Sequence, residues 1–322
     1  MSLAEQLLNP ESLPATLWDK ENTFLRLPVE FAAAYERLID RYGLRALATS
    51  RTEKDSPTGG ISKAETDQHF AQQFDNSAAR AQLALTNVTG DLIGVSNALI
   101  RALSGNSICV TDAPCGAGAA TYAFLCAIAE LRAHSVLPRM PLYVRLIGAE
   151  ISEHARTIAA EMLIELRPYL ESQAIYVEAD FHPWDVTSAL STTDLITASL
   201  RASTALSKRL LIVANFSGFL SVQGKLKASK KQLEELFRYS SGAEHVAVWL
   251  EPQMNFATGN GGVLRSIGQW VKESWHRFAR VVGIDGLETP FVTSEVKFRS
   301  TLTPGRLRPI RLAVMRLDLV RS

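Results

Sequence analysis

Residues 108–121, with the sequence ICVTDAPCGAGAAT, place an acid and a glycine turn between a strand-forming run and an Ala-rich run. The strand-forming run ends at Asp112, and Gly116 and Gly118 lie in the turn that follows. Small residues at a strand–loop–helix junction let the backbone approach a ligand closely. The stretch therefore predicts a ligand-binding loop, and residues elsewhere in the chain must indicate which ligand it binds.

Polar side chains also end three further predicted strands. Glu150 closes the second strand, Asp180 followed by Phe181 closes the third, and Asn215 followed by Phe216 closes the fourth. Ligands of parallel α/β sheets bind at the carboxyl ends of the strands, and an acid after the second strand is placed to accept both hydroxyls of a ribose. At the third strand, a carboxylate and a ring together would hold an adenine. The pattern indicates a nucleoside-containing ligand.

The elements that must position these residues alternate between strands and helices from residue 107 onward. Strands are predicted at residues 108–113, 143–151, 174–180, 210–216 and 245–251, and helices at 119–133, 153–166 and 228–239, with a broken helix within 185–206. A Gly-rich loop at 258–262 precedes a further helix. The last two strand-like runs, 291–301 and 310–320, have no helix between them, so they are expected to be antiparallel neighbours. The pattern predicts a doubly wound α/β fold with a mostly parallel sheet.

Residues 1–106 have a different pattern. Helical spacing of apolar residues occurs at 31–41, 64–86 and 92–103, and a polar loop at 50–62 contains one proline and two glycines. No sheet-like alternation of any length is visible here. We therefore expect a helical N-terminal cap over residues 1–106 and a core over residues 107–322.

The composition is ordinary for a globular protein with a substantial core. Among 322 residues, 47% are hydrophobic and 21% are charged, and the formal net charge is +1, which favours neither nucleic acid nor an acidic ligand. Three cysteines lie close together without metal-ligand spacing, so no metal is expected and a reduced, cytoplasmic setting is favoured. Neither a signal peptide nor a membrane span is predicted, and no membrane partner is expected.

The spacing of these residues resembles that of class I S-adenosylmethionine-dependent methyltransferases, over residues 100–322. The first motif of that family is an acid followed by glycines at three alternate positions. Here it reads Asp112, Pro114, Gly116 and Gly118, so a proline replaces the first glycine. The family's fold is Rossmann-like, with a seven-stranded sheet in which the last strand inserts beside the fifth. Residues 74–78 also resemble a helical segment that covers the cofactor in some members.

The resemblance implies S-adenosylmethionine as the cofactor and assigns roles to the strand ends. Glu150 would bind the ribose, Asp180 the adenine amine, and Asn215 would lie near the methionine part. The residues expected to bind the cofactor are Asp112, Pro114, Cys115, Gly116, Gly118, Glu150, Ile151, Asp180, Phe181, Asn215 and Phe216. No catalytic residue is predicted, because methyl transfer from a sulfonium requires an in-line approach and no obligatory base.

Other interpretations stay open. Asp112 is equally suited to capping the following helix, Glu150 to complementing a helix dipole, and the phenylalanines to the core. An NAD-dependent oxidoreductase would have the same fold, but the turn lacks the third small residue of the dinucleotide motif. A non-catalytic module with this fold is a further alternative.

A small-molecule or metabolite acceptor is favoured, because a helical cap suits an enclosed site. RNA is the alternative, suggested by two groups of basic residues, one at 225–231 and one at 297–321. DNA is not expected, because the fourth strand ends in Asn215-Phe216-Ser217 rather than in the N-P-P-Y pattern of DNA amino-methyltransferases. Asn215, His182 and Glu251 are predicted to lie near the mouth of the site.

Overall fold

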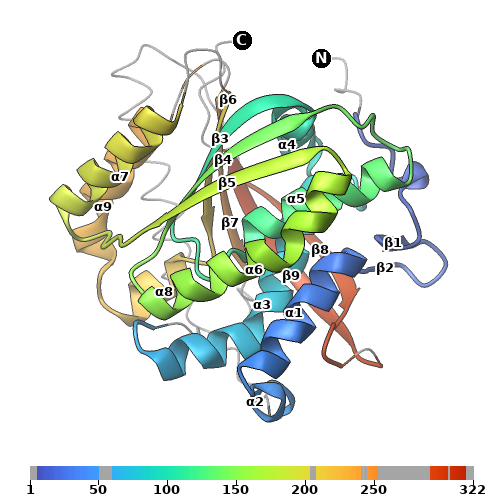
Figure 1. Cartoon of the computed structure of the whole chain (residues 1–322), viewed down its shortest axis with the longest axis horizontal. Coiled ribbons are helices and arrows are strands. Elements are labelled where there is room, and N and C mark those ends of the chain that lie inside the picture. Colours follow the sequence, from blue (N-terminus) through green and yellow to red (C-terminus); the bar gives the residue numbers. More distant parts are fainter. Residues whose placement is uncertain are drawn as a thin grey trace.

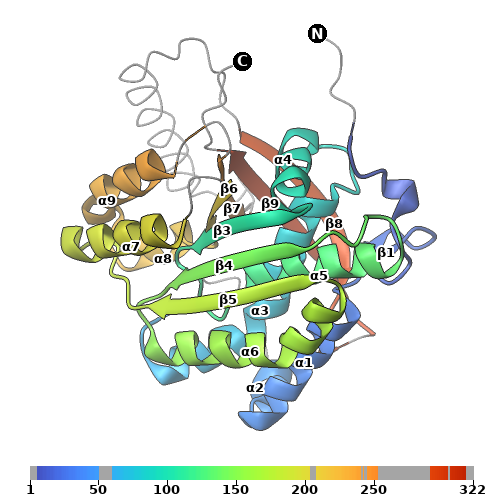
Figure 2. The same ribbon diagram turned by 45° about the horizontal axis from the view of Figure 1, so that its top comes forward.

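The structure is a computed structural model that describes residues 6–50, 60–203, 208–240, 242, 245–252, 291–303 and 305–316. One nine-stranded sheet runs through it in the order β1-β2-β8-β9-β7-β6-β3-β4-β5 (Figures 1 and 2). The strands are β1 (Trp18–Asp19), β2 (Phe24–Leu25), β3 (Asn106–Asp112), β4 (Leu142–Ala149), β5 (Ile175–His182), β6 (Lys208–Ala214), β7 (His245–Pro252), β8 (Phe291–Arg299) and β9 (Leu307–Arg316). The helices are the 3₁₀ turn η1 (Pro10–Ser12), α1 (Val29–Arg41), α2 (Arg45–Thr49), α3 (Lys63–Thr86), α4 (Ile93–Leu103), α5 (Ala119–Ala133), α6 (Glu153–Ser172), α7 (Ala189–Ala202), α8 (Ser217–Val222) and α9 (Leu226–Tyr239).

The five predicted parallel strands pair in the order β5-β4-β3-β6-β7. The chain starts this unit at the central strand β3, moves outward to β4 and β5, and then crosses to β6 and β7. The topological switch point therefore lies between β3 and β6, and this is where α/β sheets of this kind bind ligands. The doubly wound, Rossmann-like fold expected from the sequence is confirmed.

The two C-terminal strands form the expected antiparallel pair. β8 and β9 pair from Phe291↔Met315 to Arg299↔Leu307, and β9 also pairs antiparallel with β7. The last strand thus inserts beside the fifth parallel strand, which agrees with the seven-stranded sheet of the resembled family. Three predicted parts lie outside the described residues: the end of the last strand beyond Arg316, the loop at 258–262 and the helix after that loop.

Alternating side chains of the central strands fill two cores, one on each face of the sheet. In β6, Leu210 and Ile212 belong to the larger core, whereas Leu211 and Val213 belong to the smaller one. α1, α3, α4, α5 and α6 contribute buried residues to the larger core, and α7, α8 and α9 contribute to the smaller one. Both faces of β6 are therefore buried, which explains why this strand reads as a continuous apolar run.

The N-terminal part differs in one respect from the expected helical cap. The predicted helices are present as α1, α3 and α4, but β1 and β2 extend the same sheet, with Phe24 of β2 opposite Lys297 of β8. Each of these two strands has two residues, which is too short for an alternating pattern to be visible in the sequence. The helical pattern of residues 1–106 therefore did not reveal these two short strands.

Some helices differ from the predicted elements. α6 continues through Pro168 to Ser172 rather than ending at Leu166. The short helix α8 follows β6 where no helix was predicted. In the described part of the chain, no helix is long and apolar enough to cross a membrane.

Candidate functional site

A cavity lies at the carboxyl ends of β3, β4 and β6, beneath the N-terminal half of α3. It contains about 1070 Å³ of empty space when its opening to solvent is included. Its polar lining comprises Thr66, His69, Ser77, Asp112, Glu150, Ser152, Asp185, Asn215 and Lys225, and its aromatic lining comprises Phe70, Phe74, Trp184, Phe216 and Phe219.

The glycine turn forms one wall of this cavity. Gly116 and Gly118 have φ angles of 51° and 86°, a region that disfavours residues with a Cβ. A Cβ on Gly118 would lie 2.2 Å from Cε2 of Tyr122, whereas a Cβ on Gly116 would meet no atom within 4 Å. Gly118 is therefore required for packing of α5, and Gly116 keeps space open beside the loop.

We predict different losses from the two glycine-to-alanine changes. Gly118→Ala should lower the free energy of unfolding by about 2–4 kcal/mol, because it adds backbone strain and a clash with Tyr122. Gly116→Ala should cost only about 1 kcal/mol. Urea unfolding measures both. Gly94→Ala is the control, because Gly94 lies exposed in α4 and a Cβ there would meet no atom within 4 Å, so alanine should stabilise that helix by up to about 1 kcal/mol. Equal losses at Gly116 and Gly118 would contradict this assignment.

Cys115 and Pro114 also line the cavity, as predicted for the loop. The Cys115 N–H donates to the carbonyl oxygen of Ala149 over 2.9 Å, which ties the loop to the end of β4. Burial raises the pKa of the Cys115 thiol well above its ordinary value. Cys115 is therefore a buried small residue of the loop and is not an activated nucleophile.

Asp112 ends β3 with its side chain 1% exposed. Its Oδ2 accepts a hydrogen bond of 2.7 Å from the Thr121 hydroxyl, whereas its Oδ1 is buried and accepts no hydrogen bond from the residues that the structure describes. Burial, with a smaller contribution from the nearby Glu150 carboxylate, raises the pKa of Asp112 to about 7 against the lowering effect of Thr121. A buried acceptor without a partner at the edge of a cavity is suited to binding a cationic ligand group.

Glu150 lies at the end of β4 and is 9% exposed. Its carboxylate accepts hydrogen bonds from the N–H of Gly116 over 3.2 Å and from the N–H of Ser152 over 2.9 Å. Burial raises the pKa of Glu150 despite these bonds, which act in the opposite direction. Glu150 and Ile151 line the cavity, so the predicted second-strand residues lie beside the glycine loop.

The structure does not bring Asp180 and Phe181 into the cavity. β5 continues to His182, and the exposed Asp180 forms an ion pair of 2.5 Å with Arg145. Phe181 packs over Gly148, where a Cβ would lie 2.5 Å from its ring. The residues that line the cavity after this strand are instead Trp184, Asp185 and Val186. Because a proline seldom continues a strand, Pro183 was the sequence signal that the strand ends at His182 rather than at Asp180.

Asn215 and Phe216, which were predicted to bind the cofactor, line the cavity after β6. Glu251, predicted near the mouth, has a structural position instead. Its Oε1 accepts hydrogen bonds from the backbone N–H groups of Phe216 and Ser217, over 2.9 and 2.8 Å, and from the indole N–H of Trp249 over 2.5 Å. Glu251 therefore fixes the start of α8.

Helix α3 covers the cavity along one face. Thr66, His69, Phe70, Phe74 and Ser77 recur at helical spacing and all line the cavity. The segment 74–78, expected to cover a ligand, contributes Phe74 and Ser77. His69 was not predicted to take part, because a single histidine within a helical pattern carries no signal about which cavity its helix will face.

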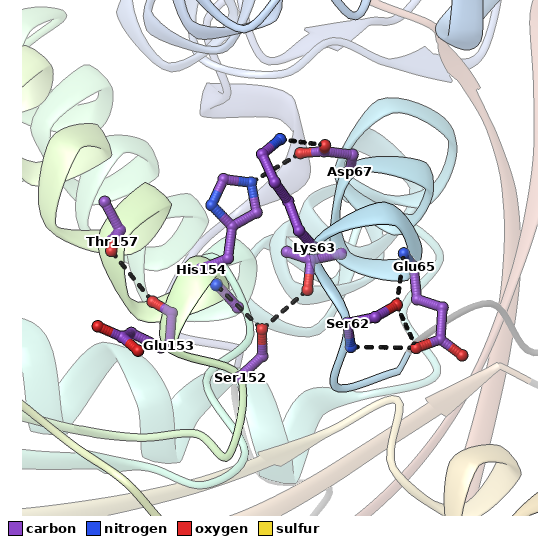
Figure 3. Close-up of polar contacts among 10 residues, drawn as sticks. Ser62, Lys63, Glu65, Asp67, Ser152, Glu153, His154 and Thr157 are labelled. Carbon is purple, nitrogen blue, oxygen red and sulfur yellow. Dashed lines mark hydrogen bonds and ion pairs between the residues drawn. The ribbon is translucent and has the colours of Figure 1, made fainter.

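A polar cluster fastens the first turns of α3 to the first turn of α6 (Figure 3). Ser62 and Glu65 form a capping box at the start of α3. Asp67 contacts Lys63 over 2.6 Å and the His154 ring over 2.7 Å. In addition, the hydroxyls of Thr66 and Ser152 lie 2.8 Å apart. Because the Ser152 N–H also contacts Glu150, this cluster links the covering helix to the buried acid of the cavity.

Thr66→Val should weaken this link while leaving the shape of α3 unchanged. We expect faster dissociation of any ligand held under α3, by about 3–10-fold, because a neutral side-chain hydrogen bond contributes about 0.5–1.5 kcal/mol. Stopped-flow fluorescence would measure the dissociation rate. Thr157→Val is a matched control, since Thr157 lies exposed on α6 and, among the described residues, its hydroxyl bonds only to the Glu153 carbonyl. An unchanged dissociation rate for Thr66→Val would show that the hydroxyl contact does not hold the helix down.

The two groups of basic residues differ in their surroundings. In the C-terminal group, Arg308 pairs with Asp75 over 3.6 Å, Arg311 pairs with Glu295 over 2.8 Å, and Arg299 lies over the Phe24 ring. These side chains contact the protein itself. In the second group, Lys225 lines the cavity, whereas Lys227 is exposed in α9 and does not line it.

Comparisons with known proteins give distant structural matches. No protein-family model matches the sequence, and no curated protein matches it. A Listeria monocytogenes protein, provisionally assigned as a class I S-adenosylmethionine-dependent methyltransferase, matches 91% of this chain with 88% of its own, at 13% identity and a TM-score of 0.36. The precorrin-6Y C5,15-methyltransferase of Geobacter metallireducens matches 69% of this chain with 87% of its own, at 9% identity and a TM-score of 0.31. Likenesses this distant carry no functional argument, so any assignment depends on the strand order and the cavity.

Proposed function

We propose that this chain is a methyltransferase that binds S-adenosylmethionine in the cavity at the switch point and methylates a small-molecule acceptor. The observation that carries the proposal is the conjunction of Asp112, the Gly116 loop and Glu150 around one cavity at the ends of adjacent strands. Asp112 Oδ2 accepts from Thr121, whereas no residue in the described part of the chain donates to Oδ1, so contact with the helix leaves one carboxylate oxygen for a ligand.

The residues present fit the parts of this cofactor. Asp112 Oδ1 is a buried acceptor suited to the ammonium group, and the space above Gly116 admits the amino-acid end beside the loop. Glu150 would hold the ribose hydroxyls, and Ile151, Trp184 and Val186 would form the apolar surroundings of the base. When bound, the cofactor supplies an electrophilic methyl group. The chain's own residues bind and orient it and exclude water beneath α3.

A small acceptor is supported by the position of α3. α3 lies over it and is fastened to α6 through Thr66 and Ser152, so a large rigid ligand would have to displace a helix. RNA is a second candidate, favoured by Lys225 at the edge of the cavity. If RNA were the acceptor, its affinity would fall steeply with salt. We further propose a cytoplasmic location.

Glu150→Gln tests the cofactor assignment. A ribose hydroxyl bonded to a carboxylate contributes about 1.5–3 kcal/mol, so we expect S-adenosylhomocysteine to bind the variant about 10–100-fold more weakly than it binds the wild type. Isothermal titration calorimetry would measure this, with NAD⁺ as the competing ligand class. Glu153→Gln is the control, because Glu153 is exposed in the next turn of the same segment. Binding of NAD⁺ without binding of S-adenosylhomocysteine or S-adenosylmethionine would overturn the proposal.

A further inference from the structure

Asn215 is held at the cavity in an unusual backbone conformation. It follows β6 with a φ of 53°, in the left-handed region that asparagine enters more readily than most residues. Its N–H donates to the Leu250 carbonyl oxygen over 2.8 Å, which anchors it to the end of β7. Its side chain is thereby fixed at the cavity wall, one residue before α8.

Arg80 of α3 determines which way the Asn215 carboxamide points. Nη1 of Arg80 lies 3.2 Å from Oδ1 of Asn215. A guanidinium has only donors, so the amide must present its oxygen to Arg80 and its NH₂ group in the other direction. Among the residues that the structure describes, none accepts a hydrogen bond from Asn215 Nδ2, and Asn215 lines the cavity. The cavity wall at the end of β6 therefore offers a hydrogen-bond donor.

The positively charged side chains at this wall also favour an anionic ligand group. The half-buried Arg80 brings a positive charge next to the amide, and Lys225 lies at the cavity edge with Nζ 6.0 Å from the Phe219 ring centroid. Glu251, behind the wall, has its Oε1 bonded to Phe216 and Ser217. On α3, Asp75 is paired with Arg308.

Asp185 also lines the cavity, near Lys225, and accepts hydrogen bonds from the N–H and hydroxyl of Thr187. Lys225 therefore has an acid close to it, whereas the NH₂ group of Asn215 is directed away from Arg80 at the cavity wall. A ligand amine at this position would meet the NH₂ donor of Asn215 without an acceptor. A ligand anion would accept from that NH₂ group and would be attracted by the positive charge of Arg80.

We infer that the methyl acceptor is a small apolar carboxylic acid, whose carboxylate is bound by Asn215 Nδ2 in the field of Arg80. This inference rests on the proposed function and names its substrate class. Phe74, Phe216 and Phe219 supply the apolar surface around it. Burial of a carboxylate needs such a paired donor and cation. Arg80 is a positioning residue, because it acts through Asn215.

Methylation of a carboxylate does not require a general base. A lone pair of the carboxylate oxygen forms the new C–O bond to the methyl carbon, while the C–S bond of the sulfonium breaks and its electron pair stays on sulfur. The product is a methyl ester and a neutral thioether. The negative and positive charges cancel, and no proton is transferred. Removal of water from the carboxylate by the phenylalanines would make it a better nucleophile.

Binding to the protein saturated with S-adenosylhomocysteine tests the inference without requiring turnover. The probes are phenylacetate, benzoate and hexanoate, each compared by calorimetry with its primary amide, and 2-phenylethylamine as the cationic analogue. We expect at least one carboxylate to bind more than tenfold more tightly than its amide, and the amine to bind more weakly still. If no carboxylate among the three is preferred over its amide, the inference is overturned.

Three variants test which residues cause carboxylates to bind more tightly than their amides. Asn215→Asp keeps a residue that tolerates the left-handed backbone but replaces the donor with a negative charge, and it should abolish the carboxylate preference. Arg80→Gln should reduce it about tenfold. Lys227→Gln removes one positive charge outside the cavity and should leave it unchanged. Preference lost equally in Lys227→Gln would indicate bulk charge and contradict the role of Asn215.

A second readout identifies the product. After incubation of each carboxylate with methyl-labelled S-adenosylmethionine, alkali should release the label as volatile methanol, as it does from methyl esters and not from N-methyl or C-methyl products. Alkali-stable label on any of these probes would overturn the inference while supporting the proposed function. Failure of S-adenosylhomocysteine to bind at all would instead overturn the proposed function, so the two failures are distinguishable.

Discussion

Asp112→Asn is expected to stabilise the ligand-free protein at pH 8 and to weaken binding of the methyl donor. Burial raises the pKa of Asp112 from 3.8 to about 7. The folded state therefore binds a proton more tightly than the unfolded state does. The free energy of unfolding consequently falls as pH rises from about 4 to 7 and is level above that. Each pKa unit corresponds to about 1.4 kcal/mol, so ionisation of the buried Asp112 lowers the free energy of unfolding by up to about 4 kcal/mol at pH 8.

Urea unfolding of wild type and Asp112→Asn from pH 4 to pH 8 would measure this effect. The stability of the variant relative to wild type should increase across that range and then stop changing. Binding of S-adenosylmethionine at pH 8 should be at least about tenfold weaker, because the buried carboxylate no longer pairs with a cation. Asp180→Asn is the matched control, since Asp180 is exposed outside the cavity. A variant whose relative stability does not depend on pH would contradict the buried, raised-pKa carboxyl at this position.

Glu251→Leu should cause the largest loss of stability in the described part of the chain around the cavity. One carboxylate oxygen accepts from the N–H groups of Phe216 and Ser217 and from the Trp249 indole, and the side chain is 5% exposed. Leucine would leave three buried donors without an acceptor, each at about 1–3 kcal/mol. We expect a loss of about 3–6 kcal/mol in the free energy of unfolding.

Glu251→Gln separates hydrogen bonding from packing. The glutamine oxygen can still accept, so its loss should be less than half that of Glu251→Leu. Hydrogen exchange at the Phe216 and Ser217 amides would report the same order, because these N–H groups lose their acceptor only in the leucine variant. Equal destabilisation by leucine and glutamine would show that the negative charge, and not acceptance of hydrogen bonds, is what Glu251 supplies.

Much of the core could be predicted from local patterns. The helix after the glycine loop has the predicted bounds, Ala119–Ala133, because Gly118 marks its start and the apolar run its length. The parallel strands were visible because both of their faces are buried, which gives continuous apolar runs. The antiparallel C-terminal pair followed from the absence of a crossover between its strands. These features depend on neighbours in sequence.

The parts that could not be predicted depend on distant contacts. The residues that follow β5 at the cavity were misjudged, because Asp180 and Asp185 are both acids near the end of one strand. Pro183 limits how far the strand can extend, and the pairing of β5 with β4 as far as Ala149↔His182 fixes its end. The two-residue strand β2 exists only because it pairs with β8. Likewise, Arg80 and Asn215 are 135 residues apart, so the orientation of the Asn215 amide is a property of the folded chain alone.

The most direct test of the account is a crystal structure of the protein with S-adenosylhomocysteine. We expect the ribose hydroxyls to donate to the Glu150 carboxylate and the ammonium group to contact Asp112 Oδ1. The base should lie between Ile151 and Val186, and the whole ligand should lie beneath α3. A nucleoside bound elsewhere on the molecule, or in this cavity with its ribose away from Glu150, would contradict the central claim that these strand ends form a methyl-donor site.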